Sequence, residues 1–254
     1  MKKLKHWLNS LSNKTAKRLS LGMLALGLLL FLLALWLNLR AGGGGTTLTT
    51  YAMGSYVQQT VYGGDEEGAA QAANTAITEL EDLISWRVEG SDVEQLNQAA
   101  GTDFLEIDQR TWNVLRTSLD VCQASGGAFD ITIAPISWLW DFDENPRLPQ
   151  AETIEALLPA VNYENVSLLE DGTAALQTHS TALDLGAVGK GAACDAAVAA
   201  YEESGVNRAV VSVGGSVGVY GEKPGGQPWT IALRDPDTDC LLYTSPSPRD
   251  RQKS

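Results

Sequence analysis

The 254-residue chain has few of the residues from which most metal and redox sites are built. It has two histidines and three cysteines, and Cys122, Cys194 and Cys240 follow no metal-binding spacing. No Walker phosphate loop, HExxH, GxSxG or CxxC motif occurs. The main support for a zinc enzyme, a P-loop NTPase, an α/β-hydrolase or a thiol oxidoreductase is therefore missing. Cys122 and Cys194 lie in helix-like stretches and are expected to be buried thiols, with a disulfide as the alternative.

Basic residues are scarce in most of the chain. Residues 41–237 carry 29 acidic and eight basic side chains. Such a body repels nucleic acid phosphates and has no basic stripe to bind them. We therefore expect no nucleic-acid partner.

The amino-terminal 40 residues have the opposite character, with seven Lys or Arg and no acid. A nearly continuous apolar run from Leu21 to Leu37 follows the basic residues. Its length is close to the ~20 residues that span a membrane, and the preceding positive charge favours a cytoplasmic amino terminus. The pattern predicts a basic cytoplasmic segment at 1–20 and a transmembrane anchor at 21–39, with the rest outside the cytoplasm. A cleaved signal peptide is the alternative.

The remaining chain divides by composition. Residues 40–50, rich in Gly and Thr, are predicted to be a flexible linker. Residues 51–238 have the mixed pattern of one folded domain. Residues 239–254 turn basic and Ser/Pro-rich, and are predicted to be an aberrant, foreign-looking tail that adds no structural element.

Periodicity predicts the elements of the domain. Apolar residues recur at helical spacing in several segments, and shorter apolar runs beside glycines read as strands. Helices are predicted at 69–86, 91–97, 111–125 and 191–204, and strands at 55–62, 165–169, 174–178, 209–213 and 229–233. Ser91 and Glu94 form a capping box, and Asp171-Gly172 favours a hairpin turn. This mixture indicates an α+β, or mixed α/β, domain.

Residues 182–191 form a small-residue segment that is bracketed by Asp184 and Lys190 and leads into the predicted Ala-rich helix. Amides at a helix start together with an ammonium group favour a phosphate, while exposed loop carbonyls can bind a hard cation. The plainer alternative is a glycine-rich helix entry with a surface lysine.

Two further clusters contain aromatic residues. The sequence GGAFDIT at 126–132 brings Phe129 and Asp130 into a glycine turn, which suits a planar ring held by backbone contacts; an ordinary Asp-capped turn is the alternative. Trp138, Trp140 and Phe142 alternate as one face of a strand would, and this favours a packing role.

Taken in order, several short motifs resemble the ApbE family, the FAD:protein FMN transferases. They are Ala52-Met53-Gly54-Ser55, the Ser91, Leu96 and Asn97 pattern, GGAFDIT, Leu139-Trp140, LDLGAVGKG with Asp195, Val213-Gly214-Gly215, Gly221, Pro228-Trp229 and Arg234-Asp235-Pro236. The resemblance covers residues 51–236. It implies one ApbE-like domain that takes FAD as substrate, joins FMN to a Ser or Thr of an extracytoplasmic acceptor flavoprotein, such as a subunit of a membrane redox complex, and releases AMP.

The resemblance also implies site residues. The backbone oxygen of Ala187 would ligate Mg²⁺, with Mn²⁺ as an alternative. Asp184 and Lys190 would be the catalytic residues and would also contact FAD. Met53, Trp86, Ala128, Phe129 and Asp130 would line the rest of the FAD site.

The chain departs from the family pattern in two ways. Ser216 stands where the family usually has Asp or Asn. A TSG segment, an HxxDP pattern and an Asp-Ala-x-x-Thr metal motif do not follow Pro236. We therefore expect a truncated and inactive transferase. An FAD-binding scaffold and a metal-dependent FAD pyrophosphatase are the competing hypotheses.

Overall fold

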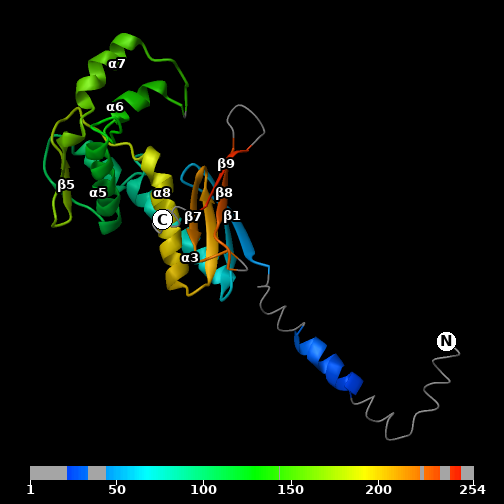
Figure 1. Ribbon diagram of the computed structural model, residues 1–254. Helices are drawn as coiled ribbons and strands as arrows, with labels where there is room; N and C mark the ends of the chain where they lie inside the picture. The colour runs from blue at the N-terminus through cyan, green and yellow to red at the C-terminus, as the bar shows by residue number, and fades with distance from the viewer. Residues whose placement is uncertain (1–21, 34–43, 143, 224–225, 235–240, 247–254) are drawn as a thin grey trace, which may run out of the picture.

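The computed structural model describes residues 22–33, 44–142, 144–223, 226–234 and 241–246. Its main layer is an antiparallel sheet with the strand order β1-β2-β6-β7. Helices α3 and α8 pack against one face of this sheet (Figure 1). The bounds are β1 Thr46–Ala52, β2 Ser55–Tyr62, α3 Glu66–Ile84, α8 Gly186–Glu203, β6 Arg208–Val213 and β7 Ser216–Tyr220.

The first core lies between this sheet and the two helices. Alternate residues of β2 and β6, such as Val57, Val61 and Val211, are fully buried against small residues of α3 and α8. The buried Tyr201 of α8 donates its hydroxyl to Gln59 Oε1 of β2 at 2.6 Å. The period-two burial of the strands thus fixes which face of the sheet the helices cover.

A second core forms around the carboxyl half of α3, where Leu80 and Ile84 pack near Leu96 and Leu115. This lobe lies beside the main layer in Figure 1. Its elements are α4 Asp92–Gln98, β3 Leu105–Glu106, α5 Gln109–Ala124, α6 Ala134–Ser137, η1 Trp138–Trp140, α7 Ala151–Leu157, η2 Leu158–Ala160, η3 Tyr163–Asn165, β4 Val166–Leu168 and β5 Thr173–Leu176. Its small sheet has the order β3-β5-β4.

The predicted mixed α/β class is confirmed, and most of the predicted elements are present. Ser91 caps α4 by accepting from the Glu94 amide at 3.0 Å, although the Glu94 carboxylate reaches Gly90 N and not Ser91 N. Strands β4 and β5 form the predicted hairpin, with Gly172 at φ 87°. Cys122 and Cys194 are buried and free, and Cys240 lies outside the described residues.

The prediction of a linker through residue 50 is wrong, because β1 begins at Thr46. The sequence TTLTTYA alternates exposed and less exposed residues, and pairs along its whole length with β2. β-branched Thr favours extended backbone, so this stretch adds an edge strand to the sheet.

The alternation of Trp138, Trp140 and Phe142 does not mark a strand. Pro135 lies in the first turn of α6, which continues into η1, and Asp141 in the left-handed region at φ 48° ends the turn. Proline is well suited to the first turn of a helix, and a 3₁₀ turn places residues two apart on different faces.

Two boundaries also differ from prediction. Helix α8 begins at Gly186, so the predicted small-residue loop forms its first turns. Residues 241–246 of the predicted tail form β9 (Leu241–Pro246), which pairs antiparallel with β8 (Thr230–Arg234). Pairing satisfies backbone groups of both strands, which explains why a short segment beside β8 becomes extended.

Residues 22–33 of the predicted anchor form a helix whose large apolar side chains are exposed. Residues 21 and 34–39 of the anchor lie outside the described part of the chain. Among the described residues, no helix has the length and apolar character needed to cross a membrane.

Candidate functional site

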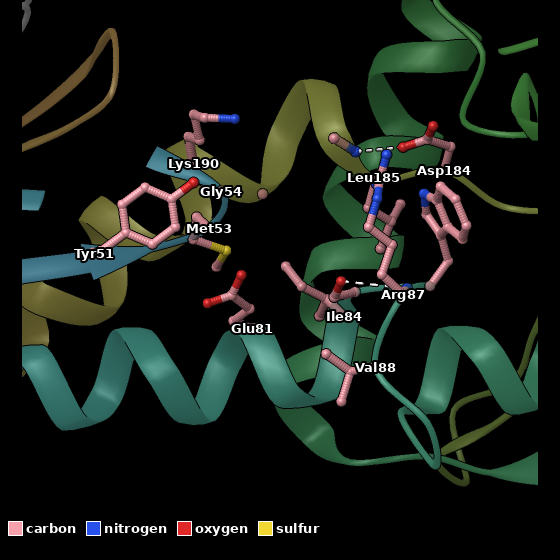
Figure 2. A pocket seen from close by; sticks show the side chains of 14 residues that line it. Tyr51, Met53, Gly54, Glu81, Ile84, Arg87, Val88, Asp184, Leu185 and Lys190 are labelled. Carbon is pink, nitrogen blue, oxygen red and sulfur yellow. Dashed lines mark hydrogen bonds between the residues drawn. The ribbon is translucent and has the colours of Figure 1, made fainter. Parts of the chain in front are cut away.

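A cavity of about 460 Å³ opens where the two cores meet. It is lined by the β1–β2 turn, the carboxyl end of α3 with the residues that follow it, and the first turns of α8 (Figure 2). Its volume is in the range of small-molecule sites.

The β1–β2 turn has an unusual backbone. Met53 and Gly54 are both in the left-handed region, at φ 55° and 63°. Positive φ is uncommon for a residue with a side chain. The conformation directs Met53 toward both cores, and its side chain packs against each of them. Met53 therefore contacts both lobes and forms part of the cavity wall between them.

Asp184 is held at the start of α8. Its Oδ1 accepts from the Gly186 amide at 2.9 Å, and its Oδ2 accepts from Ser137 Oγ at 3.0 Å. Its own amide donates to the Ile131 carbonyl at 2.9 Å. A carboxylate that accepts from a helix amino-terminal amide is stabilised by the helix dipole. The carboxylate thus has a fixed position on the cavity wall.

The preceding residue is fixed by α4. Asn97 Nδ2 donates to the Leu183 carbonyl at 3.1 Å, and Asn97 Oδ1 accepts from the Leu183 amide at 2.6 Å. Leu183 itself is fully buried. The Asn97 side chain therefore satisfies both backbone groups of the residue before Asp184.

Lys190 approaches the cavity one helical turn after Gly186. Its stem passes over the β6–β7 turn, where a Cβ added at Gly214 would lie 3.3 Å from Lys190 Cδ and Cε and 2.8 Å from Ser55 Oγ. Gly214 is also at φ 57°. Close approach and positive φ both require glycine here. Figure 2 shows the Lys190 amine beside Tyr51 and Gly54, across the cavity from Asp184.

Trp86 and its neighbour Trp138 lie on the side of the cavity opposite Lys190. Trp86 packs against Trp138 with the ring centroids 5.1 Å apart, and the Arg87 guanidinium lies 4.0 Å from the Trp86 ring centroid. The Trp86 indole Nε1 is buried and has no hydrogen-bond partner among the described residues. Such a donor is available to an acceptor atom of a ligand or to a water molecule.

The structure brings together four of the predicted site residues: Met53, Trp86, Asp184 and Lys190 all line this cavity. Ala128, Phe129 and Asp130 do not line it. Both oxygens of Asp130 accept local hydrogen bonds, from the Thr132 amide and hydroxyl and from the Tyr163 amide. In this structure Asp130 organises a turn, and contact of this segment with FAD remains a prediction.

Ala187, the predicted metal ligand, lies on another face of α8 and lines a second cavity of about 490 Å³ together with Asp195 and Ser216. Because Ala187 is in the helix, the usual i+4 pattern gives its carbonyl the Gly191 amide as partner. Partial burial raises the pKa of Asp195. Within the described segments, no group of three His, Cys, Asp or Glu side chains is arranged to hold a metal ion.

Among the cavity residues that were not predicted as site residues, three have an ionisable side chain: Tyr51, Glu81 and Arg87. Arg87 directly follows the predicted Trp86, and Glu81 lies in the last turn of α3, five residues before Trp86. Tyr51 precedes Met53 by two residues in a segment whose strand was not recognised. Closeness in sequence to Trp86 could have pointed to Glu81 and Arg87, whereas no sequence signal identified Tyr51.

Comparisons with known proteins identify the family of the chain. The family model described as "ApbE family" matches residues 53–249. An FAD:protein FMN transferase of Klebsiella pneumoniae (strain 342) is 30% identical over 201 residues, covering 75% of this chain and 57% of the relative. That of Escherichia coli (strain K12) is 26% identical over 206 residues, with the same shares. The chain thus spans about 57% of these relatives' length.

Solved structures resemble the fold. The ApbE protein of Thermotoga maritima MSB8 superposes with a TM-score of 0.73 at 27% identity, covering 79% of this chain and 66% of that chain. The flavin transferase ApbE of Vibrio cholerae gives a TM-score of 0.70 at 21% identity, over 79% and 67% of the two chains.

Proposed function

The chain belongs to the ApbE family, and on that premise we propose that the cavity between its two lobes is an FAD site for transfer of the FMN half to a protein hydroxyl; the expectation that this chain is inactive stays a prediction. The relatives that it matches are named FAD:protein FMN transferases. The acceptor would be a Ser or Thr of a flavoprotein, and AMP would be released.

One observation carries the proposal: Met53, Trp86, Asp184 and Lys190, which come from three separate stretches of the sequence, line one cavity. The Lys190 ammonium can neutralise phosphate charge. The Trp86 indole offers an apolar aromatic surface and an unpartnered Nε1 donor, and Met53 is a polarizable apolar contact. Together these groups match a ligand that has ring systems and phosphates.

The reaction forms one bond and breaks one. The acceptor hydroxyl oxygen bonds to the phosphorus of the FMN half, and the bond from that phosphorus to the bridging oxygen breaks. The oxygen leaves with AMP, and the hydroxyl proton moves to a base. Lys190 would offset the charge that develops on the departing phosphate, and the fixed Asp184 carboxylate would orient the groups around it.

A Mg²⁺ or Mn²⁺ ion belongs to the proposal, and such an ion would supply Lewis-acid chemistry at the phosphates when bound. Among the described residues the fit is incomplete, because only the Ala187 carbonyl was predicted as a ligand and no cluster of three ligating side chains is found. An ion with one neutral protein ligand binds weakly. No step is therefore assigned to it here.

The proposed setting is the outer side of a cell membrane. Support comes from the basic residues at 1–20 followed by the apolar run from Leu21. In this setting the chain would be a single-pass protein that modifies extracytoplasmic subunits of membrane redox complexes.

The purified chain should be incubated with FAD, Mg²⁺ and an acceptor protein that carries the target Thr, and the products should be measured by mass spectrometry. FMN covalently joined to the acceptor, with equimolar AMP, supports the transferase. Free FMN with an unmodified acceptor would instead identify an FAD pyrophosphatase. Bound but intact FAD would point to a scaffold.

A further inference from the structure

Two highly exposed tyrosines form a pair at the mouth of the cavity. Tyr51 of β1 and Tyr56 of β2 are directly opposite in the strand register, with exposed fractions of 68% and 73%. Their rings meet edge to face, with the centroids 5.7 Å apart. Edge-to-face contact is a preferred aromatic geometry and stabilises the orientation of both rings. Tyr51 is therefore exposed and yet held in place by its neighbour.

Tyr51 lines the cavity on the side away from Trp86. Figure 2 shows it beside Gly54 and the Lys190 amine, while Arg87 and Asp184 lie on the opposite side. Trp86 belongs to that opposite side, because the Arg87 guanidinium lies over its ring. Each side of the cavity thus has one aromatic residue and one cation, and each aromatic is supported by a second: Tyr51 by Tyr56, and Trp86 by Trp138.

From this arrangement we propose that Tyr51 is a second ring-binding residue of the site, which stacks one of the two ring systems of FAD while Trp86 contacts the other. The inference rests on the proposed function. FAD has a planar ring at each end and a diphosphate between them. The cavity likewise has an aromatic residue on each side, and Lys190 beside Tyr51 supplies a positive charge for the diphosphate.

The physical gain comes from preorganisation. A tyrosine has two side-chain torsions, and the contact with Tyr56 restricts them before the ligand arrives. Stacking then covers an aromatic face that is otherwise in water. Ring stacking is tolerant of ring identity, because every base presents a π-face. The geometry thus places one ring system of FAD against Tyr51, and binding measurements can identify which ring system it is.

Equilibrium binding tests the assignment. FAD, FMN and AMP should each be titrated against the wild-type chain and the Tyr51→Ala, Tyr51→Phe and Trp86→Ala variants. Phe104→Ala is the matched control, since Phe104 is an exposed aromatic outside this cavity. Tyr51→Ala should weaken FAD binding about tenfold, as expected for loss of one stacking contact. Tyr51→Phe, which keeps the ring, and Phe104→Ala should remain within about twofold.

The affinities for AMP and FMN show which ring system of FAD Tyr51 contacts. Loss of affinity for only AMP, or only FMN, in Tyr51→Ala supports the proposal and names the ring system involved. Unchanged FAD affinity in Tyr51→Ala, with Trp86→Ala weakened, overturns this inference alone. If flavin transfer then falls in Tyr51→Ala, the pair docks the acceptor protein instead. A wild-type chain that binds no FAD contradicts the proposed function itself.

Discussion

The side chain of Asn97 forms two hydrogen bonds with the backbone of Leu183, one to its carbonyl at 3.1 Å and one from its amide at 2.6 Å. The two residues are 86 positions apart. The pair ties helix α4 to the residue before Asp184, so the second lobe holds the cavity carboxylate in place. Asn97 acts on the site through the backbone and is not itself a cavity-lining residue.

Asn97→Ala would leave the Leu183 amide and carbonyl without their partner beside a buried side chain. An unpaired buried polar group costs about 1–3 kcal/mol. We expect the free energy of unfolding to fall by an amount in that range, as measured by urea titration, and FAD affinity to fall as Asp184 loses its support. Gln98→Ala, which removes only an exposed hydrogen bond to Glu94, is the control and should change both quantities far less. Equal effects of the two substitutions would contradict this role for Asn97.

Gly214→Ala should disturb Lys190. The added Cβ would meet Ser55 Oγ at 2.8 Å and the Lys190 stem at 3.3 Å, and the residue would keep a positive φ. The left-handed conformation alone costs a non-glycine residue roughly 1–2 kcal/mol. We expect a loss of stability of that order together with weaker FAD binding. Gly215→Ala is the matched control, because a Cβ there meets nothing within 4 Å; wild-type FAD binding in Gly214→Ala would contradict the placement of Lys190.

Glu66 should make stability depend on pH. Its carboxylate accepts from the Gly63 amide at 2.7 Å and from Thr46 Oγ at 2.9 Å, and these bonds, led by that to Gly63, lower its pKa. The ionised form is thus favoured by folding. Its contribution is present above the unfolded pKa of about 4.3 and is lost as pH falls through the lower folded value.

Glu66→Gln should accordingly be less stable than wild type at pH 7 by roughly 1 kcal/mol, and the difference should shrink as the pH falls below about 4. Urea unfolding at a series of pH values measures it. Glu67→Gln controls for the helix dipole, since Glu67 is in the same first turn but is exposed. A difference that stays constant with pH would refute the assignment to the carboxylate.

Asp195 should make the free energy of unfolding depend on pH in the direction opposite to Glu66. Partial burial raises its pKa, so folding favours the protonated form and the ionised form lowers stability at neutral pH. More than a third of Asp195 is exposed, so solvent screening limits the effect, and Asp195→Asn should raise the free energy of unfolding at pH 7 by about 0.5 kcal/mol or less. The gain should disappear as pH falls below the unfolded pKa of about 3.9. A loss of stability at pH 7 would show that the carboxylate has a favourable partner.

The sequence predicted those parts of the fold in which one local signal dominates. Strand β2 was predicted with its observed bounds because β-branched and aromatic residues are frequent there, and α3 because Ala73, Ile77 and Leu80 recur on one face. Helix α8 was predicted to begin too late, because glycines have low helix propensity and nothing local showed that Asp184 would accept from Gly186 N. Tertiary contacts decide such boundaries.

The site was also predicted only in part, because tertiary contacts bring its residues together. The family resemblance implied Met53, Trp86, Asp184 and Lys190, but their convergence depends on how the two lobes pack. Tyr51 was not found, because its partner Tyr56 becomes its neighbour only through the β1–β2 register. Residues that work through a cross-strand neighbour have no signature in a linear reading.

The central claim, that FAD binds in the cavity between the lobes, is tested most directly by hydrogen–deuterium exchange with and without FAD. Binding should slow exchange in residues 51–55, 84–88 and 184–190, which line the cavity. Residues 163–168, which line a separate groove, should be unchanged. Lys190→Ala should weaken the protection at the same FAD concentration. No protection of the three segments by FAD, or protection confined to the α5 residues of the second cavity, would contradict the account.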